Sequence, residues 1–179
     1  MLLSLFTSSN FRPNTIQLSR AVDSTMKTVA IVGIALPLVS CHFGLTYPLW
    51  RADSLALTNE SISQWSYPCA NVDPMQNASQ ARTPWPITGG SIQLELHHSW
   101  TYLFVNLGFG PEVTNFNVSL NPDGGKLLNE TGNGTFCWNQ LPVPSSELLG
   151  LEVTDGLEAS IQVVTVGDSG SALYNVSLH

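Results

Sequence analysis

The chain has 179 residues, of which 13 are acidic and 6 are basic, and its formal net charge is −7. From His42 onward it has twelve acidic residues and three basic ones, which gives a charge of about −9. Nucleic-acid binding is disfavoured, because it needs a cationic surface that neutralises phosphates. Once a leader is subtracted, the length allows one ordinary domain with an apolar core.

The first predicted element is a signal peptide over residues 26–41. Met26-Lys27-Thr28 provides a basic start, and the apolar run from Val29 to Leu36 is shorter than a bilayer-spanning helix requires. Residues 1–25 are rich in Ser and Asn. We interpret them as an over-extended start, the alternative being a second targeting sequence.

The expected cleavage site lies between Cys41 and His42. Val39 and Cys41 occupy the small-residue positions at minus three and minus one. Cleavage would leave His42 as the first residue, with a free α-amino group. The mature domain is therefore expected to cover residues 42–179.

Six Asn-x-Ser/Thr sequons follow this leader, and none has Pro in its middle position. Because a chain of this length contains one or two by chance, six after a signal peptide indicate the secretory pathway. The predicted glycosylation sites are Asn59, Asn77, Asn117, Asn129, Asn133 and Asn175.

The mature chain is predicted to be all-β, an antiparallel β-sandwich preceded by long loops. Residues 42–90 are rich in Pro and Trp, which indicates ordered loops with aromatic anchors. After them, short runs of β-branched and aromatic residues alternate with turn-forming Gly, Pro and Asn. The predicted strands are Ser91 to Leu96, Tyr102 to Leu107, Phe116 to Leu120, Ala159 to Val166 and Ala172 to Val176.

Two cysteines, Cys69 and Cys137, remain after the leader. In an oxidising compartment they are candidates for a disulfide, although the sequence does not establish that their geometry permits one.

The first metal-binding candidate is the expected mature terminus. His42 would offer its α-amine and one imidazole nitrogen to the same ion, and one further imidazole would complete a three-nitrogen set suited to copper. That imidazole would come from His97 or His98, at the end of a predicted strand. Strict alternation favours His98, which shares a face with Leu96, and leaves His97 as the fallback.

Several segments together resemble the fungal copper acquisition factor family (BIM type), which is related in fold to lytic polysaccharide monooxygenases. These segments are His42 to Pro48 (HFGLTYP), Trp65 to Cys69 (WSYPC), Arg82 to Pro86 (RTPWP), Gly89 to Ile92 (GGSI), His97 to Trp100 (HHSW), Thr131 to Cys137 (TGNGTFC), Leu141 to Pro144 (LPVP) and Ala159 to Tyr174 (ASIQVVTVGDSGSALY).

The resemblance implies an immunoglobulin-like or fibronectin-like sandwich that is secreted and held at the plasma membrane by a GPI anchor. It also implies one Cu(II) in a histidine brace of His42 and His98, with an aspartate nearby. The family pattern continues after Leu-Tyr-Asn with Cys-Ala-Asp, whereas Val176 follows Asn175 here. We therefore expect a C-terminally truncated domain without a visible anchor signal, in which Asp168 is the candidate for the carboxylate.

Three functions follow from these patterns. The first is a non-enzymatic protein that binds Cu(II) at the cell surface or cell wall and passes it to a copper transporter. The second is a copper monooxygenase acting on polysaccharide, and the third is a structural glycoprotein that binds no metal.

Overall fold

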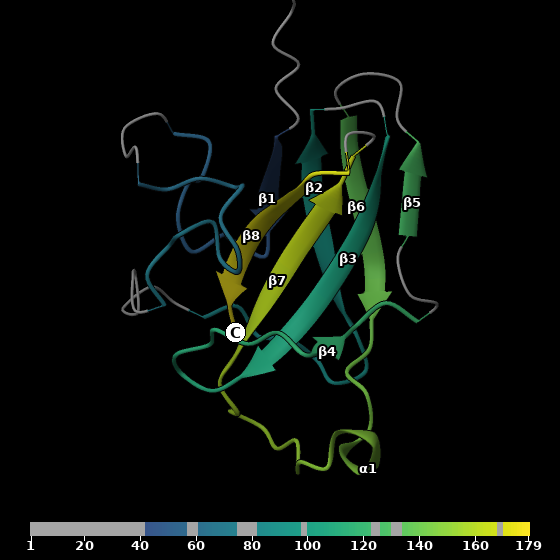
Figure 1. Ribbon diagram of the computed structural model, residues 1–179. Helices are drawn as coiled ribbons and strands as arrows, with labels where there is room; N and C mark the ends of the chain where they lie inside the picture. Colours follow the sequence, from purple (N-terminus) through teal and green to yellow (C-terminus); the bar gives the residue numbers. More distant parts are fainter. Residues whose placement is uncertain are drawn as a thin grey trace, which may run out of the picture. The chain divides into compact units, whose positions relative to one another are not determined.

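The computed structural model describes residues 42–56, 61–74, 82–97, 100–122, 126–129, 134–167 and 170–179 (Figure 1). For residues 127–129 only the backbone is described. The described residues belong to one compact unit, Pro37–His179. The expected leader, residues 1–41, lies outside the described ranges.

The described chain forms two antiparallel sheets. The three-stranded sheet has the order β1 (Phe43–Tyr47), β2 (Gly90–Leu96) and β6 (Gly134–Leu141). The five-stranded sheet has the order β4 (Val118–Ser119), β3 (Trp100–Phe109), β7 (Ala159–Val166) and β8 (Ala172–Leu178), and β5 (Lys126–Asn129) also pairs with β3. A single short helix, α1 (Ser146–Leu149), lies within these ranges. The predicted all-β antiparallel sandwich is confirmed.

The core lies between the two sheets and follows the two-residue alternation of the strands. In β2, Ile92, Leu94 and Leu96 are buried, while the residues between them are more exposed. From the opposite sheet, Leu103 and Val105 of β3 join the same cluster. Burying one such side chain contributes about 1.5–3 kcal/mol, so this core cluster provides much of the driving force for folding.

Polar contacts attach the long N-terminal segment to the outer face of the five-stranded sheet. Arg51 Nη2 donates to Ser160 Oγ over 3.0 Å, and Gln162 Nε2 donates to the carbonyl of Pro68 over 2.7 Å. Ser160 and Gln162 both belong to β7, whose residues are almost all buried. Because both of its faces are covered, β7 is buried along almost its whole length, and its polar Ser160 and Gln162 find partners in the covering segment.

Three strands differ from the sequence expectation. β1 lies inside the stretch predicted to be loops, and β5 and β6 were not predicted. Gly134 opens β6, although Gly is typical of turns. Phe136 and Trp138 of β6 pack against the core and alternate with exposed residues, so the pattern of a strand is present but follows directly on turn-forming glycines.

The candidate disulfide between Cys69 and Cys137 is wrong, because both thiols are free. Cys137 alternates with the core-facing Phe136 and therefore lies on the outer face of the three-stranded sheet, where it is exposed. Cys69 is buried in the segment that covers the five-stranded sheet and contacts Arg51. The sandwich itself separates the two thiols.

The predicted glycosylation sites whose side chains are described differ in solvent exposure. Asn117 is exposed, so a glycan fits there. Asn175 is only 2% exposed, and its Nδ2 donates to Ser54 Oγ over 3.1 Å. The folded chain therefore leaves no room for a glycan at Asn175, and that prediction is wrong for this fold. Outside the described side chains lie Asn59, Asn77, Asn129 and Asn133.

Candidate metal centre

His42 lies opposite His97 at one end of the three-stranded sheet. β1 and β2 pair with Phe43 opposite Leu96, and one step beyond this pair the N–H of His97 donates to the carbonyl of His42 over 3.1 Å. Phe43 and Leu96 both point into the core and are essentially inaccessible. The two histidines therefore sit at the rim of the sandwich, directly after the last core layer.

The surroundings favour a neutral His42 ring. Burial lowers the pKa of His42 below its usual value, and the nearby His97 lowers this pKa further because two positive rings repel. A neutral imidazole keeps a lone pair available for a metal ion. The pair thus supplies nitrogen donors of the kind that copper prefers.

Trp65 forms an aromatic wall beside His42. The two ring centroids lie 6.3 Å apart, and the ring planes meet at 78°, which is an edge-to-face arrangement. The indole is about half exposed, so it covers one side of the imidazole and leaves the other side open. Trp65 belongs to the Trp- and Pro-rich stretch in which aromatic anchors were expected, and no local pattern connects it with His42.

Gln64 fixes the first residue of β1, although no pattern in the sequence points to it. Its Oε1 accepts a hydrogen bond from the N–H of Phe43 over 3.2 Å, and its Nε2 donates to the carbonyl of the same residue over 2.6 Å. Nε2 also donates to Ser54 Oγ over 2.7 Å. The side chain is fully buried. One glutamine therefore satisfies both backbone groups of Phe43 and limits how far the neighbouring His42 can move.

The β7–β8 turn lies at the same end of the sandwich as the histidine pair. β2 and β7 end there, and β1, β3 and β8 begin there (Figure 1). The backbone N–H of Tyr174, near the start of β8, donates to the carbonyl of Gln64 over 2.8 Å and ties this turn to the same support. Asp168 belongs to this turn but lies outside the described residues.

Of the predicted metal ligands, the structure brings together His42 and the fallback His97. His98, the ligand preferred from the sequence, lies outside the described residues and stays a prediction. The described ranges contain no group of three His, Cys, Asp or Glu side chains able to hold a metal ion. The third donor expected from the sequence is the α-amine of His42, which requires removal of the leader.

A family model described as copper acquisition factor BIM1-like matches residues 40–176. The chain belongs to this family. The match includes both strands that carry the histidine pair and the turn between β7 and β8. The resemblance found from the sequence is therefore confirmed.

Curated relatives point in the same direction. The chain is 34% identical, over 84% of its length and 68% of the relative, to the lytic polysaccharide monooxygenase-like protein X325 of Hypocrea jecorina. It is 33% identical, over 86% of its length and 68% of the relative, to the lytic polysaccharide monooxygenase-like protein ham-7 of Neurospora crassa. A protein of the same description in Emericella nidulans is 29% identical over 82% of this chain and 68% of the relative. Family and relatives together support a copper-related role in fungi.

No helix within the described residues has the length and apolarity needed to cross a bilayer.

Proposed function

We propose that this copper acquisition factor binds one Cu(II) through a histidine brace at the end of the β1–β2 pair. His42 would contribute its imidazole and, after removal of the leader, its α-amine. The second imidazole would come from His98 or His97. The observation that carries the proposal is the pairing of His42 with the end of β2, which brings a second histidine next to the expected mature terminus.

Copper is the cargo in this proposal, and the surrounding residues have distinct tasks. The buried Gln64 holds the backbone of Phe43 and so limits the positions that His42 can take. Trp65 covers one side of the His42 ring. Partial burial lowers the pKa of His42 and so favours the neutral ring, which is the form that can coordinate a metal.

We propose that the protein acts outside the cell, secreted or at the outer face of the plasma membrane. The expected signal peptide and the exposed sequon at Asn117 support this location. A GPI anchor, glycosylation and a copper transporter as the acceptor are further parts of the proposal. They rest on the resemblance to the family.

The alternative proposal is an enzyme, a copper monooxygenase acting on polysaccharide. The printed names of the relatives, lytic polysaccharide monooxygenase-like proteins, are the observation that favours it. The two proposals differ in one measurement. Copper-loaded protein that consumes peroxide and releases oxidised oligosaccharides is an enzyme, whereas tight binding without turnover identifies a carrier.

The decisive experiment uses protein secreted by a eukaryotic host. Intact-mass and N-terminal analysis should find His42 as the first residue, and copper titration followed by electron paramagnetic resonance should saturate at one Cu(II) per chain. An extra residue ahead of His42 should weaken binding markedly, because the α-amine would no longer belong to the same residue as the imidazole of His42. A different terminus, or no copper binding by the His42 form, would overturn the proposal.

Separate His97→Ala and His98→Ala variants identify the second ligand. The variant that removes the copper ligand should lose as much copper affinity as the chain with an extra residue ahead of His42, and the other variant should not. The other variant is its matched control, since it changes the same residue type one position away. Equal and small effects in both would leave the metal-free structural glycoprotein as the better interpretation.

A further inference from the structure

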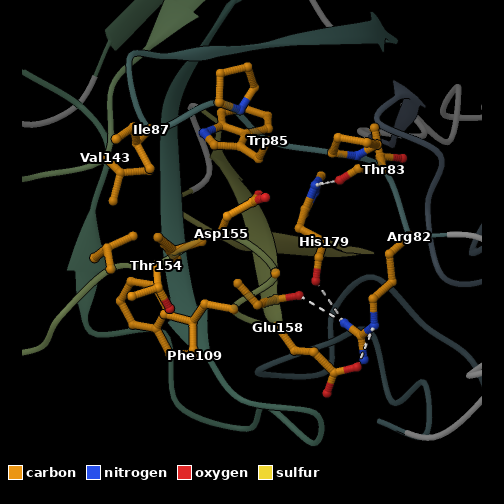
Figure 2. Close-up of a pocket in the computed structure, with 17 residues that line it drawn as sticks. Arg82, Thr83, Trp85, Ile87, Phe109, Val143, Thr154, Asp155, Glu158 and His179 are labelled. Atoms are coloured by element: carbon orange, nitrogen blue, oxygen red, sulfur yellow. Dashed lines mark hydrogen bonds and ion pairs between the residues drawn. The ribbon is translucent and has the colours of Figure 1, made fainter.

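A cavity of about 560 Å³ lies at the end of the sandwich opposite the histidine pair (Figure 2). It is formed where β3 ends and β7 begins, together with the segment before β2 and the residue that follows β8. Its volume is in the range of pockets that bind small organic molecules. The apolar part of its lining comes mainly from Trp85, Ile87, Leu107, Phe109, Val143 and Leu157.

One wall of the cavity is held rigidly by His179. Its Nδ1 lies 2.8 Å from the carbonyl of Thr83, so this nitrogen must carry the proton and donate. Its Nε2 lies 2.8 Å from Ser177 Oγ and accepts the hydroxyl proton. The ring also packs edge to face against Trp85, with 5.3 Å between centroids. These contacts set the orientation of the indole.

Among the described residues that line the cavity, Arg82 is the only cationic side chain, and it already has partners. Arg82 Nε lies 3.2 Å from Glu158 Oε1, and its Nη1 donates to the carbonyls of His179 and Ala159 over 2.8 and 3.2 Å. Figure 2 shows these contacts at the edge of the cavity. Arg82 therefore links the first residue of β7 to the residue that follows β8. Its ion pair with Glu158 balances the charge of that carboxylate.

Two polar groups in the cavity have no partner among the described residues. The indole Nε1 of Trp85 is buried and makes no hydrogen bond. Within the same described ranges, the carboxylate of Asp155 makes no ion pair or hydrogen bond. Figure 2 shows this carboxylate directed toward the Trp85 ring. Because the indole Nε1 is buried, the group that a ligand in the cavity can meet is the exposed Asp155 carboxylate. An ionised carboxylate only accepts hydrogen bonds, so its partner must supply a donor or a positive charge.

We propose that this cavity is a second binding site, distinct from the metal centre, for a small organic ammonium ion with an apolar body. The apolar body would fill the space between Trp85 and Phe109. The ammonium group would lie between the Asp155 carboxylate and the face of the indole, which attracts cations. The net charge of about −9 after His42 further favours a cation over an anion.

The test uses a matched series of probes on metal-free protein. 3-Phenylpropylammonium, 3-phenylpropanol and 4-phenylbutanoate have a similar body but carry a positive, a zero and a negative charge. In ¹H–¹⁵N spectra the indole N–H of Trp85 reports binding, and the Trp85→Phe variant identifies this signal by its disappearance. We expect the ammonium probe to shift the signal at the lowest concentration and the carboxylate probe to leave it unchanged.

The Asp155→Asn variant tests the charged contact without disturbing the core, because Asp155 is exposed and touches no core residue through a polar contact. It should weaken the binding of 3-phenylpropylammonium about fivefold and leave the affinity for 3-phenylpropanol unchanged. Glu152→Gln, an exposed carboxylate outside the cavity lining, is the matched control and should change neither.

Three results would overturn the proposal. These are equal affinities for the three probes, equal effects of the Asp155 and Glu152 variants, and an unchanged Trp85 signal at saturating probe. A titration repeated with copper-loaded protein should give the same affinities, since the site lies at the opposite end of the strands.

Discussion

Gln64 hydrogen-bonds both backbone groups of Phe43, accepting from its N–H and donating to its carbonyl. Phe43 is the first residue of β1 and follows the predicted copper ligand His42. A side chain buried beneath the surface loops thus acts as an additional strand partner at the edge of the three-stranded sheet. We expect copper binding at the proposed centre to depend on this support.

Gln64→Ala should therefore weaken both the fold and copper binding. The change leaves the N–H and carbonyl of Phe43 without partners, and we expect a loss of about 2–4 kcal/mol in the free energy of unfolding. Copper affinity should fall because the terminus is less restricted. Denaturant unfolding and copper titration measure the two effects.

Gln140→Ala is the matched control for Gln64, since Gln140 makes an exposed side-chain bond to the carbonyl of Thr88. It should change the unfolding free energy by less than about 1 kcal/mol. If Gln64→Ala left copper affinity at the wild-type value, Gln64 would have no role in positioning His42.

Acidification should destabilise the fold through His179. Burial lowers the pKa of His179 from 6.5 to about 4, and the nearby Arg82 also lowers it. Between these values the unfolded chain binds a proton that the folded chain does not, so stability falls as the pH falls from about 6.5 to about 4. The loss should approach about 3 kcal/mol at the lower end.

His179→Gln tests this origin of the pH dependence. An amide can replace both ring contacts, donating to Thr83 and accepting from Ser177, without titrating. The slope of unfolding free energy against pH should flatten in this window, leaving the smaller part that comes from the lowered pKa of His42. An unchanged slope would assign the acid sensitivity to other groups.

Arg51 is expected to stabilise mainly by its volume. The side chain is 1% exposed, and burial lowers its pKa because a charged guanidinium is poorly solvated there. Arg51→Ala should cost about 3–5 kcal/mol by leaving a cavity. Arg51→Met retains most of the volume and removes the charge, so it should remain within about 2 kcal/mol of the wild type. Thermal and denaturant unfolding of the two variants provide the comparison.

Ser160→Ala separates the hydrogen bond of Arg51 from its packing, because Ser160 Oγ accepts from Arg51 Nη2. A loss near 1 kcal/mol is expected. If Arg51→Met proved as damaging as Arg51→Ala, polar bonding by the guanidinium would be the main contribution.

Two strand glycines should respond differently to a methyl group. A Cβ at Gly108 would collide with the Val113 side chain and the carbonyl oxygen of Asn115. At Gly44 the nearest atom is Glu95 Cβ at 3.6 Å, an ordinary contact. Gly108→Ala should therefore cost about 2–3 kcal/mol, and Gly44→Ala less than about 1 kcal/mol. Equal midpoints in urea for the two variants would contradict the described packing around Gly108.

The strands that could be predicted are those whose own residues carry the alternation or strand preference of a β-strand. β7 was predicted with its observed bounds, Ala159–Val166, because five of its eight residues are β-branched and the run lies between turn-forming glycines. β1 was missed because FGLTY lies in a stretch dominated by Pro and Trp, and only its pairing with β2 makes it a strand. Local pattern carries no information on such a distant partner.

The same reasoning applies to the two sites. His42 and the fallback His97 could be named as candidate ligands from the sequence, since a cleavage site and a strand end are local features, and their role as ligands stays a prediction. A single glutamine in a loop gives no such indication, so Gln64 could be found only from the structure. The cavity around Trp85 was equally hidden, because its lining comes from segments far apart in the chain. His98 and Asp168 remain predictions.

The two thiols differ in accessibility, because Cys137 is exposed on β6 and Cys69 is buried in the N-terminal segment. Their rates of chemical modification should therefore differ. A maleimide should modify Cys137 at once, whereas Cys69 should react only when the segment lifts from the five-stranded sheet. The delay between the two additions, followed by mass spectrometry, would measure how often this covering layer opens while the sandwich beneath it stays intact.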